Sequence, residues 1–548
     1  MKSMLHPNTK ANRPFDHHRK TNVIVFSESG KVIFHRYGDE ANISSVCAVL
    51  QTLRASTRID ERLGFGDIQR ISTLTSKIVF MNVGHLTFVA ISYKSSDGED
   101  CIDTDDYLRL QLEYVYSGIL FTLTEEVQHM AQNDLDIALM LGSCSKKLRY
   151  VLDEMELPWT IDTPWFIGGV NILSPIPGRI RDHSSKILAM ECSKTPSIIY
   201  ALLTIKKQLI TIVQPRDKMY QLTSHDLNLL MEFLDGQIHE AWFPICLPRL
   251  STTGFVHCYQ CDLSRTSDLK LTIISQEPST EEFSTLRSVA DKIRYQLGFH
   301  SQLEDEEDVL RIYNLNDKGL KGDDKLLWER IPSKHNEKRS DYVSHHNKAL
   351  FNHRFLNSIK IARDHDLQGT RMSEYCDMSL MQHFLFRCNI PIRDFQSGSV
   401  VGCLPQIVGP SFEQTLDEIE LASKYWKIYQ RLSLIPRLGS TAHMEDAFGG
   451  FVNGNIDANQ DAQDSFESSR VSQSLHERNS DTSETTLYYK EDKDEAYVIY
   501  WSKDFELYGI MNGAMNTRDN ALILCSTLVE TLLHKKNDIF IRLPLAFL

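Results

Sequence analysis

The sequence lacks any hydrophobic run long enough to span a bilayer, which takes about 18 or more consecutive apolar residues. The nearest candidate, Ile198 to Val213, is interrupted by Lys206 and Lys207. The opening residues, Met1 to Pro7, contain no apolar core of signal-peptide length. We therefore expect a cytosolic protein, in which the 11 cysteines are reduced thiols.

Motifs for catalysis and for metal binding are also lacking. The chain contains no phosphate-binding GxxxxGK[ST], no HExxH and no GxSxG. Its one close cysteine pair, Cys258 and Cys261, lies in an alternating apolar segment that predicts a β-strand, and no second pair stands at zinc-site spacing. We interpret both as strand residues, with metal or redox chemistry as the alternative. A large chain without a catalytic set more often binds proteins than converts substrates, so we expect neither enzyme chemistry nor a cofactor.

The charge of the chain is unevenly distributed. The net charge of −14 argues against a general nucleic-acid binder. Between Ser440 and Glu495 the sequence has 13 acidic and four basic residues, a net charge of −9. Such an acidic stretch with few aromatic residues is typical of a solvated, disordered loop. We therefore predict a disordered insert at 440–495.

The segment from Asn22 to Leu157 predicts alternating strands and helices. Apolar residues on both sides of Gly30 predict a β-hairpin, because glycine allows the tight turn. A helix should follow, with Asp39 and Glu40 at its start, where acidic side chains are favourable. Its apolar stripe comprises Ile43, Val46, Val49, Leu50 and Leu53. Three strands, a long helix from about Asp105 and a further helix near 135–157 complete the block. The order β-β-α-β-β-β-α predicts an α+β fold with a five-stranded antiparallel sheet, as in longin (roadblock-related) domains.

The same order recurs twice along the chain. Residues 197–300 repeat the hairpin, a helix that Ser224 should cap, three strands and a closing helix. Residues 381–548 begin with strands near His383 to Cys388, continue with a helix at 413–432, and end with two strands, a helix from Thr517 and an apolar run. The predicted domains are a short disordered tail (1–20), a first longin domain (21–157), a linker (158–196), a second longin domain (197–300), a charged linker (301–380) and a third longin domain (381–548), which the acidic insert 440–495 interrupts.

Several strings resemble one protein family. The run SESGKVIFHRYGDE, from Ser27 to Glu40, resembles the opening motif of the vacuolar fusion protein Mon (SAND) family. LQLEYVY from Leu110 and WFPICLPR from Trp242 are similar to further motifs of that family. FELY from Phe505 and FIRLPL from Phe540 extend the resemblance to the end of the chain. The strings occur in the family's order and cover most of the chain.

The resemblance implies a function as well as a fold. Members are tri-longin proteins that pair with a Ccz-type tri-longin subunit to form a guanine nucleotide exchange factor. The heterodimer acts on a late-endosomal Rab GTPase of the Rab-seven type, and it is recruited peripherally to endosomes and to lysosomes or vacuoles. Membranes containing phosphatidylinositol 3-phosphate are implied as a further partner, and a third regulatory subunit is left open. The alternative is a longin-based trafficking tether or coat-like adaptor without exchange activity.

Two groups of residues are candidates for binding sites. The hairpin–helix junction of the first domain is the candidate interface with the GTPase and the partner subunit. Its residues are Arg36, Tyr37, Gly38, Asp39 and Glu40, although a turn and a helix cap would equally explain this string. A basic spot on the second domain is the candidate lipid site, with a solvated hairpin tip as the alternative. That spot consists of Lys206, Lys207, Arg216 and Lys218.

Overall fold

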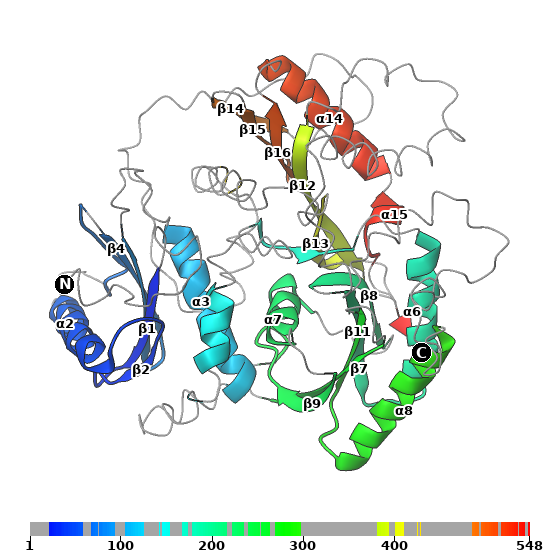
Figure 1. The fold of residues 1–548 in the computed structure, drawn as a ribbon, viewed down its shortest axis with the longest axis horizontal. Coiled ribbons are helices and arrows are strands. Elements are labelled where there is room, and N and C mark those ends of the chain that lie inside the picture. The colour runs from blue at the N-terminus through cyan, green and yellow to red at the C-terminus, as the bar shows by residue number, and fades with distance from the viewer. Residues whose placement is uncertain are drawn as a thin grey trace, which may run out of the picture. The chain divides into compact units, whose positions relative to one another are not determined.

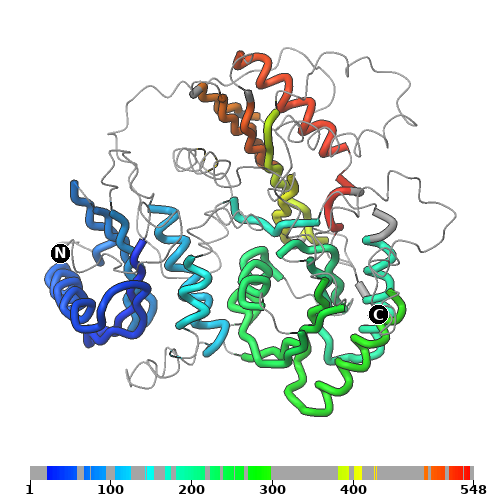
Figure 2. Tube along the Cα trace, viewed as in Figure 1, coloured from blue at the N-terminus to red at the C-terminus, as the bar shows by residue number. Residues whose placement is uncertain are grey.

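The computed structural model of the chain describes residues 21–58, 67–74, 76–93, 105–124, 142, 145–153, 167–173, 178–205, 207–215, 222–234, 239–251, 254–263, 269–297, 381–393, 400–409, 425, 428, 485–492, 495–512, 517–534, 536–542 and 546–547 (Figures 1 and 2). They fall into two compact units. The first comprises Met1–Thr160, Leu229–Leu234 and Pro244–Val256, and the second comprises Ile161–Asn228, Asp235–Phe243 and His257–Leu548. Across the described residues, no helix is both long and apolar enough to cross a membrane.

The first sheet has five antiparallel strands in the order β2-β1-β5-β4-β3. The strands are β1 (Asn22–Ser27), β2 (Val32–His35), β3 (Arg70–Ser72), β4 (Ser76–Val83) and β5 (Leu86–Tyr93). Helix α2 (Glu40–Arg58) buries Ile43, Val46 and Leu50 against one face. Helix α3 (Asp105–Leu123) packs on β4 and β5, where the rings of Tyr116 and Phe88 meet edge to face. Since alternate strand residues point to opposite faces, β1 and β5 are buried on both sides.

The second sheet repeats this order as β8-β7-β11-β10-β9. Its strands are β7 (Ile198–Ile205), β8 (Gln208–Pro215), β9 (Glu240–Ile245), β10 (Val256–Asp262) and β11 (Leu269–Ser275). Helices α6 (Gly178–Cys192) and α8 (Thr280–Gln296) pack together over one face (Figure 1). Helix α7 (Ser224–Leu234) lies between β8 and β9 in the chain. The sequence predicted no helix within the linker 158–196. That prediction missed α6, which buries Ile187, Leu188 and Cys192 in the core of the second sheet.

The third sheet has the order β14-β15-β16-β12-β13. Its strands are β12 (Met381–Arg393), β13 (Val400–Val408), β14 (Thr486–Asp492), β15 (Glu495–Trp501) and β16 (Phe505–Asn512), followed by α14 (Arg518–His534) and α15 (Lys536–Ile539). Counted within each repeat, all three sheets have the strand order 2-1-5-4-3. The insert predicted at 440–495 is too long at its end, because β14 pairs with β15 and buries Leu487. The linker at 301–380 and, except for Tyr425 and Ile428, the helix at 413–432 lie outside the described residues.

Two of the sheets carry a sixth strand that the sequence did not predict. The short strand β6 (Val170–Asn171) pairs in parallel with β13. Close to the end of the chain, β17 (Ala546–Phe547) pairs in parallel with β8. The predicted α+β fold of five-stranded antiparallel sheets packed with helices is therefore confirmed, and a parallel strand extends the second and third sheets.

The helix starts differ in detail from the predictions. In α2, the Asp39 carbonyl accepts the backbone N–H of Ile43, so Asp39 lies at the predicted cap position. In α7, Thr223 is the cap rather than Ser224, because the Thr223 hydroxyl accepts the N–H of Asp226 at 3.2 Å. Both Thr223 and Ser224 are good caps in isolation, and the helix begins one residue earlier than the sequence suggested.

Candidate functional site

The hairpin–helix junction of the first unit is built around a left-handed glycine. Gly38 has φ +107°, which a side chain would disfavour, and it turns the chain from β2 into α2. The side chain of Asn22 fixes Tyr37, the residue before Gly38. Its Nδ2 donates to the Tyr37 carbonyl and its Oδ1 accepts the Tyr37 N–H, each at 3.2 Å. The junction is therefore held in one conformation by contacts from β1.

Arg36 points inward from this junction. Its side chain is buried, and its guanidinium donates to the Thr21 carbonyl at 3.0 Å and to Asp153 Oδ1 at 2.6 Å. The Tyr37 ring lies 4.8 Å from the guanidinium, and the Tyr37 hydroxyl donates to the same carboxylate. Arg36 thus joins the start of β1, the hairpin and the helical residues 145–153. This geometry supports a structural role for Arg36 at the turn rather than a direct contact with the GTPase or the partner.

Only the end of the predicted site faces outward. Gly38, Asp39 and Glu40 are exposed, so they form an acidic edge at the start of α2. His35, just before the junction, is partly buried and its carbonyl accepts two bonds from the guanidinium of Arg149. Burial, and then the charge of Arg149, lower the pKa of His35, which favours the neutral ring. The role of the three outward residues as a GTPase contact stays a prediction.

The outward side of α2 carries a surface that the sequence analysis did not identify. We define the α2 outer face by the exposed residues of α2 that follow Glu40: Ala41, Ser44, Ser45, Ala48, Val49, Thr52, Leu53, Ala55 and Ser56. None of them is charged. Val49 and Leu53, which were predicted to face the core, remain 45% and 42% exposed. A helix that faces water usually shows charged residues there, so this face is unusually apolar for an open surface.

The hydroxyl groups of this face are turned back onto the helix. Ser44 donates to the carbonyl of Glu40 at 2.8 Å, and Ser45 donates to that of Ala41 at 3.1 Å. Thr52 and Ser56 make equivalent bonds three or four residues back. Because these hydroxyls have partners within α2, the face presents mainly methyl and methylene groups. It can therefore be covered without leaving these donors unpaired.

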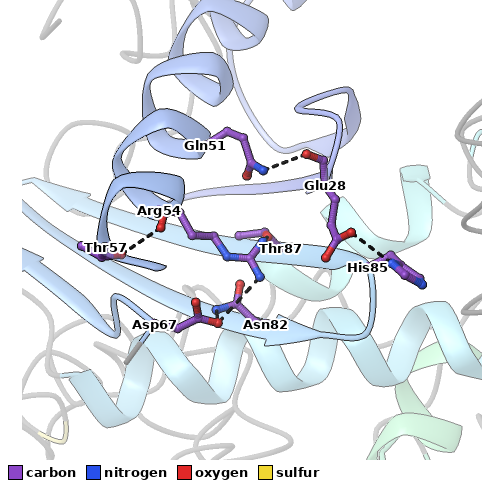
Figure 3. A network of polar contacts seen from close by, with 8 residues as sticks. All are labelled: Glu28, Gln51, Arg54, Thr57, Asp67, Asn82, His85 and Thr87. Atoms are coloured by element: carbon purple, nitrogen blue, oxygen red, sulfur yellow. Dashed lines mark hydrogen bonds and ion pairs between the residues drawn. The ribbon is translucent and has the colours of Figure 1, made fainter. Parts of the chain in front are cut away.

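The inner polar side chains of α2 fix the helix to the sheet (Figure 3). Arg54 is buried and donates to the Thr87 hydroxyl of β5, and Asp67 lies 3.7 Å from its guanidinium. Asn82 of β4 donates to the same carboxylate at 3.1 Å. Gln51 donates to the carbonyl of Glu28, in the turn between β1 and β2, at 2.7 Å. These contacts hold α2 in one orientation, so its outer face is rigidly presented.

Two further strings of the sequence meet within the first unit. In WFPICLPR, the Cys246 N–H donates to the Phe121 carbonyl at the end of α3, at 2.9 Å. Phe121 also packs on Phe233, with the ring centroids 4.7 Å apart. Glu113 belongs to the LQLEYVY string of α3. Burial raises its pKa to about 7 despite the opposing charge of Arg249. Both strings therefore serve packing around α3.

The other candidate sites are less well supported by the geometry. Lys207 is buried, with 4% of the residue exposed, whereas Lys206, Arg216 and Lys218 lie outside the described residues. The lipid site thus stays a prediction. Cys258 and Cys261 are buried in β10, three positions apart, so their side chains point to opposite faces of the sheet and cannot share a metal ion. Burial raises the pKa of both thiols, to about 11 for Cys261.

Comparisons with known proteins place these strings in a family. Residues 21–151 match the first longin domain, and residues 196–293 the second longin domain, of FUZ, MON1 and HPS1. The chain is 28% identical over 267 residues to Protein SAND of Takifugu rubripes, an alignment that covers 47% of each chain.

Two further relatives, from a bird and a yeast, are both named as MON1 vacuolar fusion proteins. Vacuolar fusion protein MON1 homolog A of Gallus gallus is 28% identical over 298 residues, which cover 53% of this chain and 50% of the relative. Vacuolar fusion protein MON1 of Yarrowia lipolytica is 28% identical over 314 residues, with 55% and 52% covered. The chain thus spans about half the length of the curated relatives it matches. The chain therefore carries two longin domains of the kind found in FUZ, MON1 and HPS1, and it is similar to curated proteins of the Mon (SAND) family.

Proposed function

We propose that the chain is a non-catalytic subunit of a guanine nucleotide exchange factor, and that the α2 outer face binds the second subunit. Its relatives are named vacuolar fusion proteins, which supports a role in membrane trafficking. The observation that carries the proposal is this uncharged face, on a helix held rigidly in the first longin domain. A contiguous apolar patch on a folded unit is typical of a protein interface.

The chemistry of exchange is consistent with such a scaffold. Releasing GDP requires a surface that binds the nucleotide-free GTPase better than the GDP-bound form. No general base or nucleophile is needed for that step. The proposed partner is a Ccz-type tri-longin subunit, and the proposed substrate is a Rab-seven-type GTPase of late endosomes. The acidic edge of Gly38, Asp39 and Glu40 adjoins the α2 outer face and would face basic residues on the GTPase or on the partner.

The site of action follows from the same proposal. The heterodimer would be peripherally recruited to endosomes and to lysosomes or vacuoles through phosphatidylinositol 3-phosphate. It would drive endosome maturation, fusion with the lysosome or vacuole, and autophagy. The basic residues near Lys206 are the proposed lipid contact. A third regulatory subunit would be an addition to this heterodimer.

The proposal is tested with one charged substitution on the α2 outer face. Val49→Glu places a carboxylate in the centre of the proposed interface, where burial without a partner costs several kcal/mol. We expect the affinity for the Ccz-type subunit to fall by about a hundredfold or more. Met190→Glu is the matched control, because Met190 on α6 is 49% exposed. Wild-type affinity in Val49→Glu would contradict the proposed interface.

Exchange activity is tested on the reconstituted complex. The release of fluorescent GDP from a Rab-seven-type GTPase should be fast with both subunits and slow with the chain alone. Equal rates with and without the partner would contradict a composite site. A complex that forms but does not accelerate release would favour the tether or adaptor function instead.

A further inference from the structure

We propose that the strap, defined as Ile167–Leu173, joins the second and third sheets into one cooperatively folding body. The sequence predicted a linker between the first and second domains at 158–196, and such a linker would belong to neither the second nor the third sheet. The strap is instead a structural element of both sheets. The strap and nearly all of both sheets lie within the second unit, and their coupling does not depend on the proposed exchange activity.

Successive residues of the strap pair with strands of two different sheets. Val170 and Asn171 form the parallel strand β6 beside β13, where they pair with Gln406 and Ile407. The Ile172 N–H donates to the Ile407 carbonyl at 3.0 Å. One residue later, the Leu173 N–H donates to the carbonyl of Leu209 in β8, also at 3.0 Å. The backbone thus leaves the edge of the third sheet and joins the edge of the second within one residue.

Side chains from three elements bind the carbonyl groups of the strap. Arg387 of β12 donates to the Gly168 carbonyl at 2.9 Å and pairs with Glu506 of β16. Asn228 of α7 donates to the Gly169 carbonyl at 3.0 Å. Arg181 of α6 donates to Leu173 at 3.1 Å and to Ile210 of β8 at 3.0 Å. Two of these three donors come from the second domain and one from the third, so the strap is held from both sides.

The strap is also packed as a core segment. Ile167, Val170 and Ile172 are at most 2% exposed. Gly169 lies so close to β13 that an added Cβ would stand 2.8 Å from Ile407 Cγ1 and 3.2 Å from the Pro405 carbonyl oxygen. A surface tether has no need of such a close approach, whereas a strap between two packed edges does.

The end of the chain makes a second connection in the opposite direction. The strand β17 follows all five strands of the third sheet in sequence, but pairs with β8 of the second sheet. Before it, the N–H and carbonyl of Ile541 bond the side chain of Gln406 in β13, both at 2.9 Å. Each sheet therefore takes an edge strand from chain outside its own five strands. Covering both edges in this way also removes sites for edge-to-edge association.

Hydrogen exchange on the full chain tests the coupling. If the second and third sheets open together, the slowest amides of both sheets should have the same free energy of opening at every denaturant concentration. These amides are expected in β7, β11, β12 and β16. Gly169→Ala should lower protection in both sheets by the same factor, about tenfold or more, and leave β1 and β5 unchanged. Gly254→Ala is the matched control, because the nearest atom to its added Cβ, Ser251 Oγ, lies at an ordinary 3.8 Å.

A deletion of residues 546–548 gives an independent measurement. Among the described residues, the deleted strand pairs with β8 and lies against α6, so a local role predicts faster exchange in β8 and α6 alone. The proposal predicts faster exchange in β12 and β16 as well. It is overturned if the two sheets open separately in the wild type, or if Gly169→Ala and the deletion each affect a single sheet.

Discussion

Replacing Arg36 with alanine separates a structural role of the RYG string from a binding role. The side chain is buried and ties together Thr21, Tyr37 and Asp153. Arg36→Ala removes all three contacts and leaves the Thr21 carbonyl without that donor. We therefore expect the first longin domain to lose stability, because the start of β1 at Thr21 and the helical residues 145–153 are no longer tied to the hairpin.

The magnitude can be worked from the contacts. The buried charge-assisted bond to the Thr21 carbonyl is worth about 1.5–3 kcal/mol. The carboxylate of Asp153 is 50% exposed, so its ion pair adds at most about 1 kcal/mol. The contact with the Tyr37 ring adds about 0.5–1 kcal/mol. The expected total is about 3 kcal/mol, or roughly a hundredfold in the opening equilibrium.

Hydrogen exchange of β1 and β5 measures this loss directly in the full chain. Glu40→Ala is the matched comparison, because Glu40 is exposed at the same junction. We expect it to leave exchange nearly unchanged. If Arg36→Ala weakens GTPase or partner binding while exchange in β1 and β5 stays at the wild-type rate, the structural interpretation of Arg36 is wrong.

Three further predictions concern single groups. The pKa of Glu113, raised to about 7 by burial, means that the folded state holds this proton more tightly than the unfolded chain. The stability of the first unit should therefore fall by up to about 3 kcal/mol as the pH rises from about 4.5 to above 7. Glu113→Gln should abolish that dependence in urea titrations, and an unchanged pH profile would contradict it. Thr223→Ala should destabilise α7 by about 1 kcal/mol, and Ser224→Ala by much less. Hydrogen exchange of the α7 amides measures both effects, and a larger effect of Ser224→Ala would show that Ser224 is the cap. Cys258 and Cys261 should react with a thiol reagent only after unfolding, because burial raises the pKa of both thiols; rapid labelling of the native chain would show that β10 is open.

The repeating strand pattern was readable from the sequence because long strands and helices carry periodicity. The alternation around Gly30 and the helix that follows it predicted the first sheet closely. The two-residue strands β6 and β17 are too short to show any period, and their pairing is fixed by segments far along the chain. Helix α6 was missed for a different reason. Its sequence is mostly polar, and only a few side chains, such as Ile187 and Leu188, reach the core.

The functional strings were harder to interpret, because a motif does not say which way its side chains point. Arg36 looked like a surface charge, yet it is buried and paired. Lys207 was a candidate for a lipid-binding basic spot, with a solvated hairpin tip as the alternative, yet it is buried. In both cases the sequence gives the residue type, and only the fold determines whether the charge meets water or a partner. A long cationic side chain can satisfy either environment, so its identity alone does not decide.

The width of the apolar stripe on α2 was the signal that could have revealed the proposed interface. At about 100° per residue, the buried positions Ile43, Val46, Cys47, Leu50 and Arg54 occupy an arc of about 100°, which is what packing on one sheet requires. Val49 lies about 60° beyond that arc, and Leu53 lies between Val49 and its edge. The first sheet leaves Val49 and Leu53 45% and 42% exposed, so the stripe of about 160° extends beyond the sheet and implies a second apolar surface that covers it. Val49→Glu tests this reasoning, because it changes the residue farthest from the first arc.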